Sequence, residues 1–426
     1  MVYNIAIVGA GPAGCMLARL LLHLNNHNLN VSIFESEAAL DFRSQGGTLD
    51  LHVKTGQAAL KAAGLFDEFS KYARYDGEAM KFADKDLLCY VQTGGGKPGS
   101  LTGRPEIDRP QLREMLYNSL PEGTVRWRKK LTRVDADNRS LYFADGTIEQ
   151  SFDLIVGADG AWSRVRSVLT DVKPFYSGIG GHALRILDAQ QKHPELYDLV
   201  NRGSLFSWSD GKSIMAQYMS DGSLNVSTWS VRAEGWQMSC GYDIHDAKAV
   251  KDACLEDFAG WDEMLLAFTQ AAEDDVTPRD LYMLPVGTKW DHVPGVTVIG
   301  DAAHLMTPFA GEGVNLAFED CLKLSEAIFT AASSNRSHST QEGTTEGTSQ
   351  LDTNIHAFEQ DMFSRARKTG QMTYDMLELM YLTPGAPRTC VERYLLRAVE
   401  DELGRTLTVL LTPVVYLWFF VFKLLW

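Results

Sequence analysis

A short glycine pattern near the start of the chain constrains the fold more than any other feature. Residues 2–8 have the apolar character of a strand, and the hexapeptide GAGPAG follows at residues 9–14. Residues 15–24 favour an apolar helix and residues 31–34 favour a second strand. A strand, a glycine turn, a helix and a strand within about 35 residues predict a β-α-β crossover, which favours a parallel sheet.

The chemistry that suits this pattern is dinucleotide binding. Gly9 allows the tight turn, Gly11 lets the backbone approach a pyrophosphate, and Gly14 lets the helix pack closely on the strand. The N-terminus of the helix offers free N–H groups and partial positive charge to phosphates. Glu35, 21 residues after Gly14, is placed to hold the hydroxyls of an adenosine ribose. A glycine turn that binds nothing is the alternative, and the pattern does not distinguish FAD from NAD.

Two later motifs also follow apolar strands. They are ADGAWSRVR at residues 158–166 and GDAAHLMTPFAGEGVN at residues 300–315. Asp301, at a strand end, suits the hydroxyls of a ribityl chain. The backbone at Gly311 and Gly313 can approach a flat ring, and its N–H groups with the following helix favour the negative charge of a reduced flavin.

Simpler interpretations stay open for single residues of these motifs. Asp159 and Asp301 are each also compatible with an ordinary turn. His304 follows Asp301 closely and invites a catalytic role, but we interpret it as a packed or capping histidine.

The motifs together resemble those of the single-component FAD-dependent monooxygenases of the para-hydroxybenzoate hydroxylase class. All three occur in the order typical of that class, over roughly residues 3–330. GGTLDL at residues 46–51 and PEIDRPQLR at residues 105–113 are similar to the tetracycline-inactivating branch. Thr307 is a departure, because that branch often has a second proline there.

The resemblance implies contacts to the cofactor. Arg43 and Arg109 are expected near the phosphates and the ribityl chain, and Asp159 lies in a motif linked to both FAD and NADPH. The ring is expected along residues 308–315. The predicted cofactor-binding residues are Gly9, Gly11, Pro12, Ala13, Gly14, Glu35, Arg43, Arg109, Asp159, Asp301, Pro308, Gly311, Gly313, Val314 and Asn315. No catalytic residue and no metal site is predicted.

The resemblance also implies a reaction. NADPH or NADH reduces FAD, O2 adds at flavin C4a, and the hydroperoxide transfers one oxygen atom to a hydrophobic polycyclic small molecule, in specialised metabolism or drug inactivation. The expected outcome is hydroxylation, epoxidation or Baeyer–Villiger oxidation, and this chemistry belongs to the cofactor. Met215, Tyr218 and Trp229 are candidates for the substrate wall, with core packing as the alternative. An FAD-dependent reductase without oxygen insertion and a flavin redox sensor without turnover stay open as other functions.

We therefore predict an α/β fold: a Rossmann-type (GR2-like) FAD-binding domain with an inserted, mainly antiparallel β-sheet substrate domain and C-terminal helices. Residues 55–72 are expected to form a single helical stretch. The predicted parts are FAD-binding segments at 1–75, 105–173 and 286–330, substrate-side strands at 76–104, the substrate domain at 174–285, a disordered insertion at 331–352, C-terminal helices at 353–404 and a hydrophobic tail at 405–426.

Composition argues against several other classes of function. Forty Lys and Arg against 55 Asp and Glu give a net charge of −15 at pH 7, which disfavours nucleic-acid binding. The six cysteines are scattered without metal-ligand spacing, which predicts reduced thiols and a cytoplasmic location. The first residues lack the basic segment of a signal peptide. We expect a monomer.

The tail is the most hydrophobic part of the chain. Residues 407–426 read LTVLLTPVVYLWFFVFKLLW, and as a helix they would extend about 30 Å, the thickness of a bilayer core. Two interpretations stay open. The tail is either a membrane anchor with the catalytic part in the cytosol, or a helix packed on the protein's own apolar surface or on a partner. Pro413 and two threonines weaken the membrane-anchor interpretation.

Overall fold

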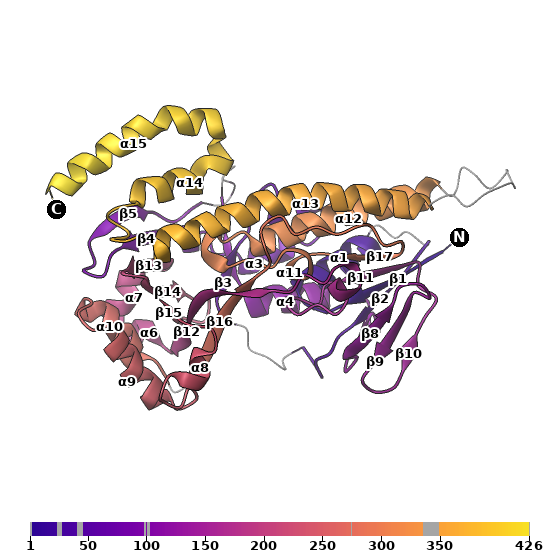
Figure 1. The fold of residues 1–426 in the computed structure, drawn as a ribbon, viewed down its shortest axis with the longest axis horizontal. Coiled ribbons are helices and arrows are strands. Elements are labelled where there is room, and N and C mark those ends of the chain that lie inside the picture. The colour runs from indigo at the N-terminus through magenta and orange to yellow at the C-terminus, as the bar shows by residue number, and fades with distance from the viewer. Residues whose placement is uncertain are drawn as a thin grey trace, which may run out of the picture.

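The computed structural model describes residues 2–23, 28–40, 46–97, 99, 103–273, 275–334 and 349–425, and Figure 1 shows their arrangement. The strands are β1 (Tyr3–Val8), β2 (Leu29–Phe34), β3 (Thr48–Asp50), β4 (Met80–Ala83), β5 (Cys89–Thr93), β6 (Glu106–Asp108), β7 (Val125–Arg126), β8 (Leu131–Asp135), β9 (Ser140–Phe143), β10 (Ile148–Glu149), β11 (Leu154–Gly157), β12 (Phe175–Ile186), β13 (Ser204–Ser209), β14 (Lys212–Tyr218), β15 (Leu224–Val231), β16 (Thr277–Met283) and β17 (Val296–Val298).

The helices cover these strands and extend beyond them. The α-helices are α1 (Pro12–His23), α2 (Gly56–Ala62), α3 (Phe66–Tyr72), α4 (Arg109–Asn118), α5 (Arg166–Leu169), α6 (Ala189–Lys192), α7 (Pro194–Val200), α8 (Trp236–Ser239), α9 (Ala247–Asp257), α10 (Glu263–Ala271), α11 (Asp301–His304), α12 (Gly313–Ser334), α13 (Gln350–Leu377), α14 (Val391–Leu403) and α15 (Arg405–Leu425). Shorter turns of helix are η1 (Asp76–Glu78), η2 (Pro308–Ala310) and the π-helical η3 (Glu378–Leu382).

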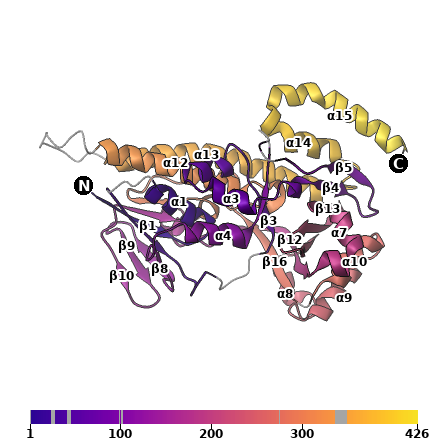
Figure 2. The ribbon, with the colours of Figure 1, turned by 180° about the vertical axis from the view of Figure 1, so that it is seen from behind.

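A five-stranded sheet with the order β17-β11-β1-β2-β7 forms the centre of the first part. All its pairings are parallel, with Ile5 of β1 opposite Val31 of β2 and Leu154 of β11. The central strands are buried on both faces, which explains their continuous apolar sequences. α1 packs between α4 and α12, and Figure 2 shows α3 and α4 on the side hidden in Figure 1. β8, β9 and β10 form a separate three-stranded antiparallel sheet. This sheet packs near β2, where the rings of Phe34 and Phe143 lie 5.1 Å apart.

The inserted part is a seven-stranded sheet with the order β16-β12-β15-β14-β13-β4-β5. It is antiparallel except where β13 runs beside β4. Side chains alternate between its two faces. Leu224 and Val226 join an apolar core with residues of α7, α9 and α10. Trp229, on the opposite face, joins a second core with Met376 of α13 and Tyr394 of α14.

The last helices connect the two parts. α13 runs along α12 beside the parallel sheet and continues, through η3, to the inserted sheet (Figure 1). α14 and α15 then pack against each other. α15 corresponds to the predicted hydrophobic tail, and among the described residues it is the one helix long and apolar enough to cross a membrane.

The predicted fold class is confirmed, whereas several element boundaries are wrong. Residues 55–72 form two helices, α2 and α3, because Gly64 adopts a φ of +66° after α2 ends. The helices α6 to α10 within residues 174–285 were not foreseen. Residues 331–334 and 350–352 are helical rather than part of a disordered insertion, and residues 335–348 lie outside the described residues. The other domain boundaries stay predictions.

Glu359 attaches α13 to the parallel-sheet part. Its side chain is fully buried. Oε1 accepts hydrogen bonds from Thr297 Oγ1 at 2.9 Å and Trp290 Nε1 at 3.3 Å, and Oε2 lies 2.8 Å from His292 Nδ1. One carboxylate therefore pairs with two buried side chains, Trp290 and Thr297, and with the half-buried His292, all of which precede or belong to β17.

We expect Glu359→Ala to lower the free energy of unfolding by about 3 kcal/mol, because it leaves these buried groups without their acceptor. Urea denaturation followed by circular dichroism measures the change. Asp361→Ala is the matched control on the same helix. Its side chain is 48% exposed, so the expected loss is below about 1 kcal/mol. Equal losses in the two variants would contradict this role of Glu359.

Candidate functional site

The three sequence motifs meet at one edge of the parallel sheet. They follow the carboxyl ends of β1, β11 and β17, and Glu35 follows the carboxyl end of β2. Because these strands are parallel neighbours, their carboxyl ends share one edge. β1 has β2 on one side and β11 on the other, so the chain order reverses there, and such a switch point is where open α/β sheets bind ligands.

The glycine turn after β1 requires glycine for two different reasons. Gly9 has a φ of +105°, and a Cβ there would lie 2.4 Å from the carbonyl oxygen of Ala158. A Cβ on Gly14 would lie 2.0 Å from the carbonyl oxygen of Gly9. A Cβ on Gly11, in contrast, would meet no atom within 4 Å. α1 begins at Pro12, so open space borders the N-terminus of this helix beside Gly11.

Glu35 is buried beside the glycine turn. Its Oε2 accepts a hydrogen bond from the backbone N–H of Ala10 at 2.6 Å, and its Oε1 accepts from Glu37 N at 2.9 Å. Arg113 of α4 donates to Glu37 Oε2 at 2.6 Å and to the carbonyl oxygen of Ala10 at 3.4 Å. Sequence reasoning missed Arg113 as a site residue, although it lies in the quoted PEIDRPQLR stretch. Its close approach to the turn depends on packing of α4 against α1.

The carboxylate of Asp159 holds its own turn together. Oδ1 accepts from Ser163 Oγ at 2.5 Å and Oδ2 from Arg164 N at 2.7 Å, while burial raises the pKa of the carboxyl. Arg166 then donates to the carbonyl oxygens of Ala161 at 2.7 Å and Ala302 at 2.9 Å. The second and third motifs are thereby joined directly.

Asp301 and Arg109 lie near each other at the same edge. Asp301 is exposed and makes no hydrogen bond to any residue that the structure describes. Part of the Arg109 side chain is exposed to solvent, but protein atoms crowd around its guanidinium group. Loss of solvation lowers the pKa of its guanidinium, Asp301 opposes this shift, and Arg279 of β16 adds to it. The carboxylate of Asp301, which no described residue hydrogen-bonds, and the guanidinium of Arg109 therefore lie at the border between the two parts of the protein. Arg43 lies outside the described residues.

The loop of the third motif is exposed at Pro308 and Gly311, and Val314 is half-buried. A Cβ on Gly313, the first residue of α12, would meet no atom within 4 Å. Space is therefore open at the N-terminus of a second helix, as it is beside Gly11.

Asn315 is fully buried and its side chain is occupied by another segment. Oδ1 accepts from the N–H of His52 at 2.8 Å and from Thr55 Oγ1 at 3.2 Å, and Nδ2 donates to the carbonyl oxygen of Asp50 at 2.9 Å. Asn315 thus positions residues 50–55 beside α12, and only its backbone is left to contact a cofactor.

A cluster of titratable side chains adjoins this loop and was not predicted. His52 Nε2 lies 3.0 Å from Asp50 Oδ2, and His52 Nδ1 lies 3.6 Å from Glu312 Oε2. Glu312 and His52 are far apart in sequence, so no local pattern signals the cluster.

The packed interpretation of His304 is confirmed. The side chain is buried, and Nε2 lies 2.6 Å from Oδ2 of Asp320, which is itself fully buried. Arg365 donates to the other oxygen of Asp320 at 2.8 Å.

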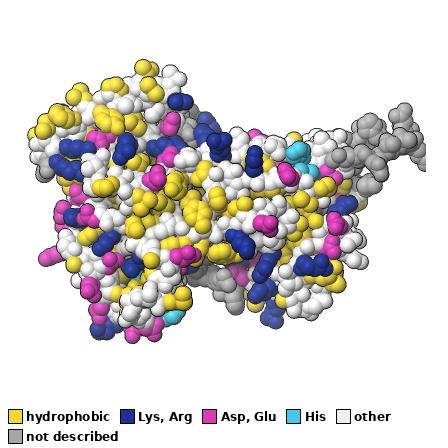
Figure 3. All heavy atoms as spheres, viewed as in Figure 1, with side chains coloured by type: hydrophobic (Ala, Val, Ile, Leu, Met, Phe, Trp, Pro, Cys, Tyr) yellow, Lys and Arg dark blue, Asp and Glu magenta, His cyan; other side chains and the backbone are white. Residues whose placement is uncertain are grey.

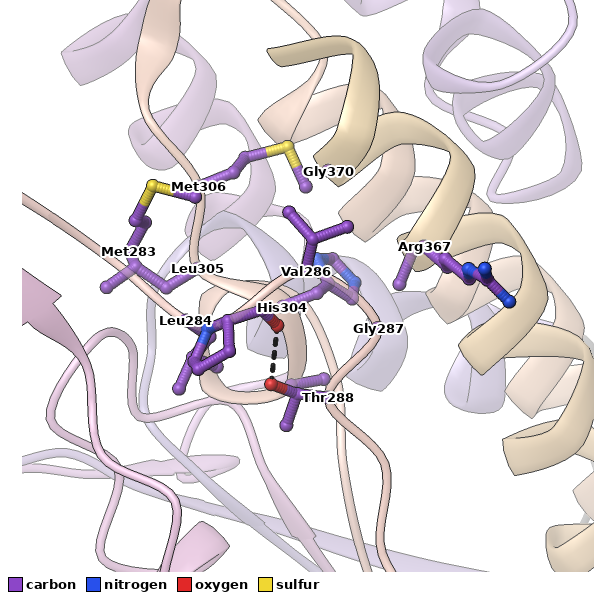
Figure 4. A pocket seen from close by; sticks show the side chains of 13 residues that line it. Met283, Leu284, Val286, Gly287, Thr288, His304, Leu305, Met306, Arg367 and Gly370 are labelled. Atoms are coloured by element: carbon purple, nitrogen blue, oxygen red, sulfur yellow. Dashed lines mark hydrogen bonds between the residues drawn. The ribbon is translucent and has the colours of Figure 1, made fainter. Parts of the chain in front are cut away.

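A small cavity lies behind the third motif, between α13 and the loop after β16 (Figure 4). Met283, Val286, Met306 and Arg367 are among the side chains around it. Its volume of about 20 Å³ admits roughly one water molecule, so it is not a substrate site.

An apolar cluster borders the exposed loop on the side of the inserted sheet. Phe309 and Ala310 of η2 pack against it, and the rings of Phe309 and Tyr381 lie 4.9 Å apart. Met215 is half-buried in the same cluster, and Trp229 is buried in it. The third wall candidate, Tyr218, instead packs with the other core of the sheet, 5.5 Å from the ring of Tyr197.

The strand order, the glycine turn at the switch point and the two later motifs define a dinucleotide-binding flavoprotein fold. A model of the FAD binding domain family matches residues 2–341, and the chain belongs to this family. Monooxygenase penA of Penicillium thymicola is 32% identical over 440 residues, which cover 90% of this chain and 96% of that protein. The chain is thus an FAD-dependent monooxygenase, and the predicted class is confirmed.

Two solved structures have the same fold. Klebsiella pneumoniae HpxO, solved with FAD and uric acid, has a TM-score of 0.71 at 16% identity, and the match covers 97% of each chain. The tetracycline destructase Tet(51) has a TM-score of 0.63 at 16% identity, covering 94% of this chain and 96% of that one. At this identity the likeness is one of fold.

The described residues fit FAD. Open space next to Gly11 and Gly313 leaves two helix N-termini available, the first to a pyrophosphate and the second to the anionic edge of a ring. Asp301 offers carboxylate oxygens that no described residue occupies. Filling either glycine position would obstruct the approach of the cofactor.

Gly11→Ala and Gly14→Ala should impair two different properties, FAD affinity and thermal stability respectively. We expect Gly14→Ala to lower thermal stability of the apoprotein, because its Cβ would overlap the carbonyl oxygen of Gly9. Gly11→Ala should fold like the wild type but bind FAD at least about tenfold more weakly, because its Cβ points into open space that the pyrophosphate would use. Thermal unfolding and quenching of FAD fluorescence measure the two effects. Wild-type FAD affinity in Gly11→Ala would contradict this placement.

Proposed function

We propose that the chain uses NADPH or NADH and O2 to insert one oxygen atom into a hydrophobic polycyclic small molecule. The observation that carries this proposal is the contact between the loop of the third motif and the apolar cluster. Phe309 and Ala310 pack against that cluster, while the next residue, Gly311, is exposed and a Cβ on Gly313 would meet no atom within 4 Å. A flat ring on this backbone would face an apolar wall.

Several of the predicted site residues have a specific part in this proposal. The glycine turn and the start of α1 bind the pyrophosphate, Glu35 orients the adenosine ribose, and Asp301 accepts from the ribityl hydroxyls. Arg109 supplies positive charge beside Asp301, and Asp159 keeps the second motif in shape. When bound, FAD supplies the electron transfer and oxygen chemistry, while the chain orients the substrate and excludes water.

The apolar cluster supports a hydrophobic substrate. Phe206 and Met215 of the inserted sheet are half-buried at its border, as is Leu281 of β16. Partly buried apolar side chains next to a flat-ring site suit an extended apolar ligand. The fold likeness to a tetracycline destructase supports a polycyclic substrate, in drug inactivation or specialised metabolism.

Oxygen transfer is tested with ¹⁸O2. The purified protein is given FAD, NADPH or NADH, and a panel of polycyclic aromatic compounds that includes tetracycline. We expect one ¹⁸O atom per product molecule and one reduced nicotinamide consumed per oxygen atom. A product without ¹⁸O would favour the reductase alternative. Flavin that is reduced and reoxidised without any product across the panel would favour the redox sensor.

Asp301→Ala should weaken FAD binding by roughly 10- to 100-fold, because it removes a charged acceptor of hydroxyl hydrogen bonds. Asp291→Ala is the matched control. It removes an exposed carboxylate that precedes β17 and therefore lies at the opposite end of the same strand. Isothermal titration of the apoprotein with FAD compares the two variants. Equal affinities would show that Asp301 does not contact the cofactor.

A further inference from the structure

The outer face of α15 is apolar and is not covered by the part of the chain that the structure describes. Eleven large apolar side chains of this helix are more than 40% exposed, among them Leu410, Val414, Leu417, Trp418, Leu424 and Leu425. Only 11% of its most apolar window is buried, which distinguishes it from the core helix of a globular domain. In Figure 3, apolar side chains cover the outward side of α15.

The inner face of α15 is attached to the protein along its length. Phe419 is buried in a small cluster with Tyr90 of β5 and Val391 of α14. Lys423 Nζ lies 2.6 Å from Glu392 Oε1, and the side chain of Glu392 is only 9% exposed. The helix therefore lies flat against α14 and β5.

The shape of the exposed face indicates what covers it. At about 100° per residue, the exposed side chains occupy roughly 200° of the helix circumference, and the contacts to the protein occupy the rest. A helix of a second copy would cover only a narrow seam of so convex a surface. A lipid layer conforms to all of it.

The side chains at the border of this face suit a bilayer surface. Tyr416 and Trp418 combine an apolar ring with a polar group, the type enriched at headgroup level. Arg405 is the first residue of α15, and Arg388 donates a hydrogen bond to the carbonyl oxygen of Lys423. Both arginines are exposed, although the whole chain carries a charge of −15. Figure 3 shows Lys and Arg side chains interspersed with Asp and Glu side chains along the junction of α15 with the rest of the protein.

We propose that α15 lies in the plane of a lipid bilayer, with its outer face in the headgroup and upper acyl region and its inner face still on the protein. A spanning orientation would separate Lys423 from the buried Glu392 and expose Phe419 and its partners. An interfacial orientation keeps both. This combines the two sequence-based interpretations of the tail: the helix packs on its own protein and also presents a membrane face.

This placement has a consequence for the substrate, which rests on the proposed function. Val91 and Leu395 pack against both the small cluster under α15 and the apolar cluster beside η2. Apolar packing is thus continuous from the membrane face to the proposed substrate wall, which suits a substrate that partitions into lipid.

The test is flotation of the full chain with vesicles of phosphatidylcholine. We expect the wild type to float, with little dependence on salt because burial of apolar surface drives binding. Leu417→Glu/Trp418→Glu should reduce the bound fraction at least about tenfold. The matched control, Ile148→Glu/Met238→Glu, adds the same charge at two exposed apolar positions elsewhere and should float like the wild type. Thermal unfolding should be the same for both variants.

Three results would overturn the proposal. The first is a wild type that does not float, or an α15 variant that floats as well as the wild type. The second is a lipid-free dimer, by light scattering, that the α15 variant converts to a monomer, since a second copy would then cover the face. The third is resistance to alkaline carbonate in membranes of the expression host, which would indicate a spanning helix. None of these results depends on bound flavin, so the proposed enzyme function is tested separately.

Discussion

The close approach of two backbones at the centre of the parallel sheet is the constraint on which the rest of the structure depends. The carbonyl oxygen of Ala158 leaves no room for a side chain on Gly9, while Gly9 N donates to Phe34 O at 2.9 Å and Ala158 N donates to Val8 O at 2.8 Å. The ends of three strands are thereby fixed within hydrogen-bond distance of one another. Everything assigned to the cofactor is built outward from this point.

The long helix α13 relates that edge to the inserted sheet. Its buried Glu359 is bonded to groups at β17, and its far end enters η3, where Tyr381 contacts Phe309. The same helix therefore contacts both the strand that precedes Asp301 and the apolar cluster beyond the third motif.

Local sequence patterns predict well what depends on neighbouring residues. The glycine turn, the strand before each motif and the apolar character of α15 are all visible in short stretches, and the fold class follows from them. The break between α2 and α3 was missed because a glycine in a helical sequence can either continue the helix or end it. The positive φ of Gly64, which ends α2, is not visible in the sequence. Arg113, the His52–Asp50–Glu312 cluster and the occupied side chain of Asn315 depend on contacts between distant segments, which a single sequence does not show. The helices on the outer face of the inserted sheet were missed because strand-like aromatic residues dominate that region.

The central claim is that FAD occupies the carboxyl edge of the parallel sheet, and a crystal structure of the complex with FAD tests it most directly. We predict the pyrophosphate within hydrogen-bond distance of the backbone at the start of α1, the ribityl chain against Asp301, and the ring along Gly311 to Asn315. FAD bound away from the ends of β1, β11 and β17, or with its ring turned away from η2, would contradict the account.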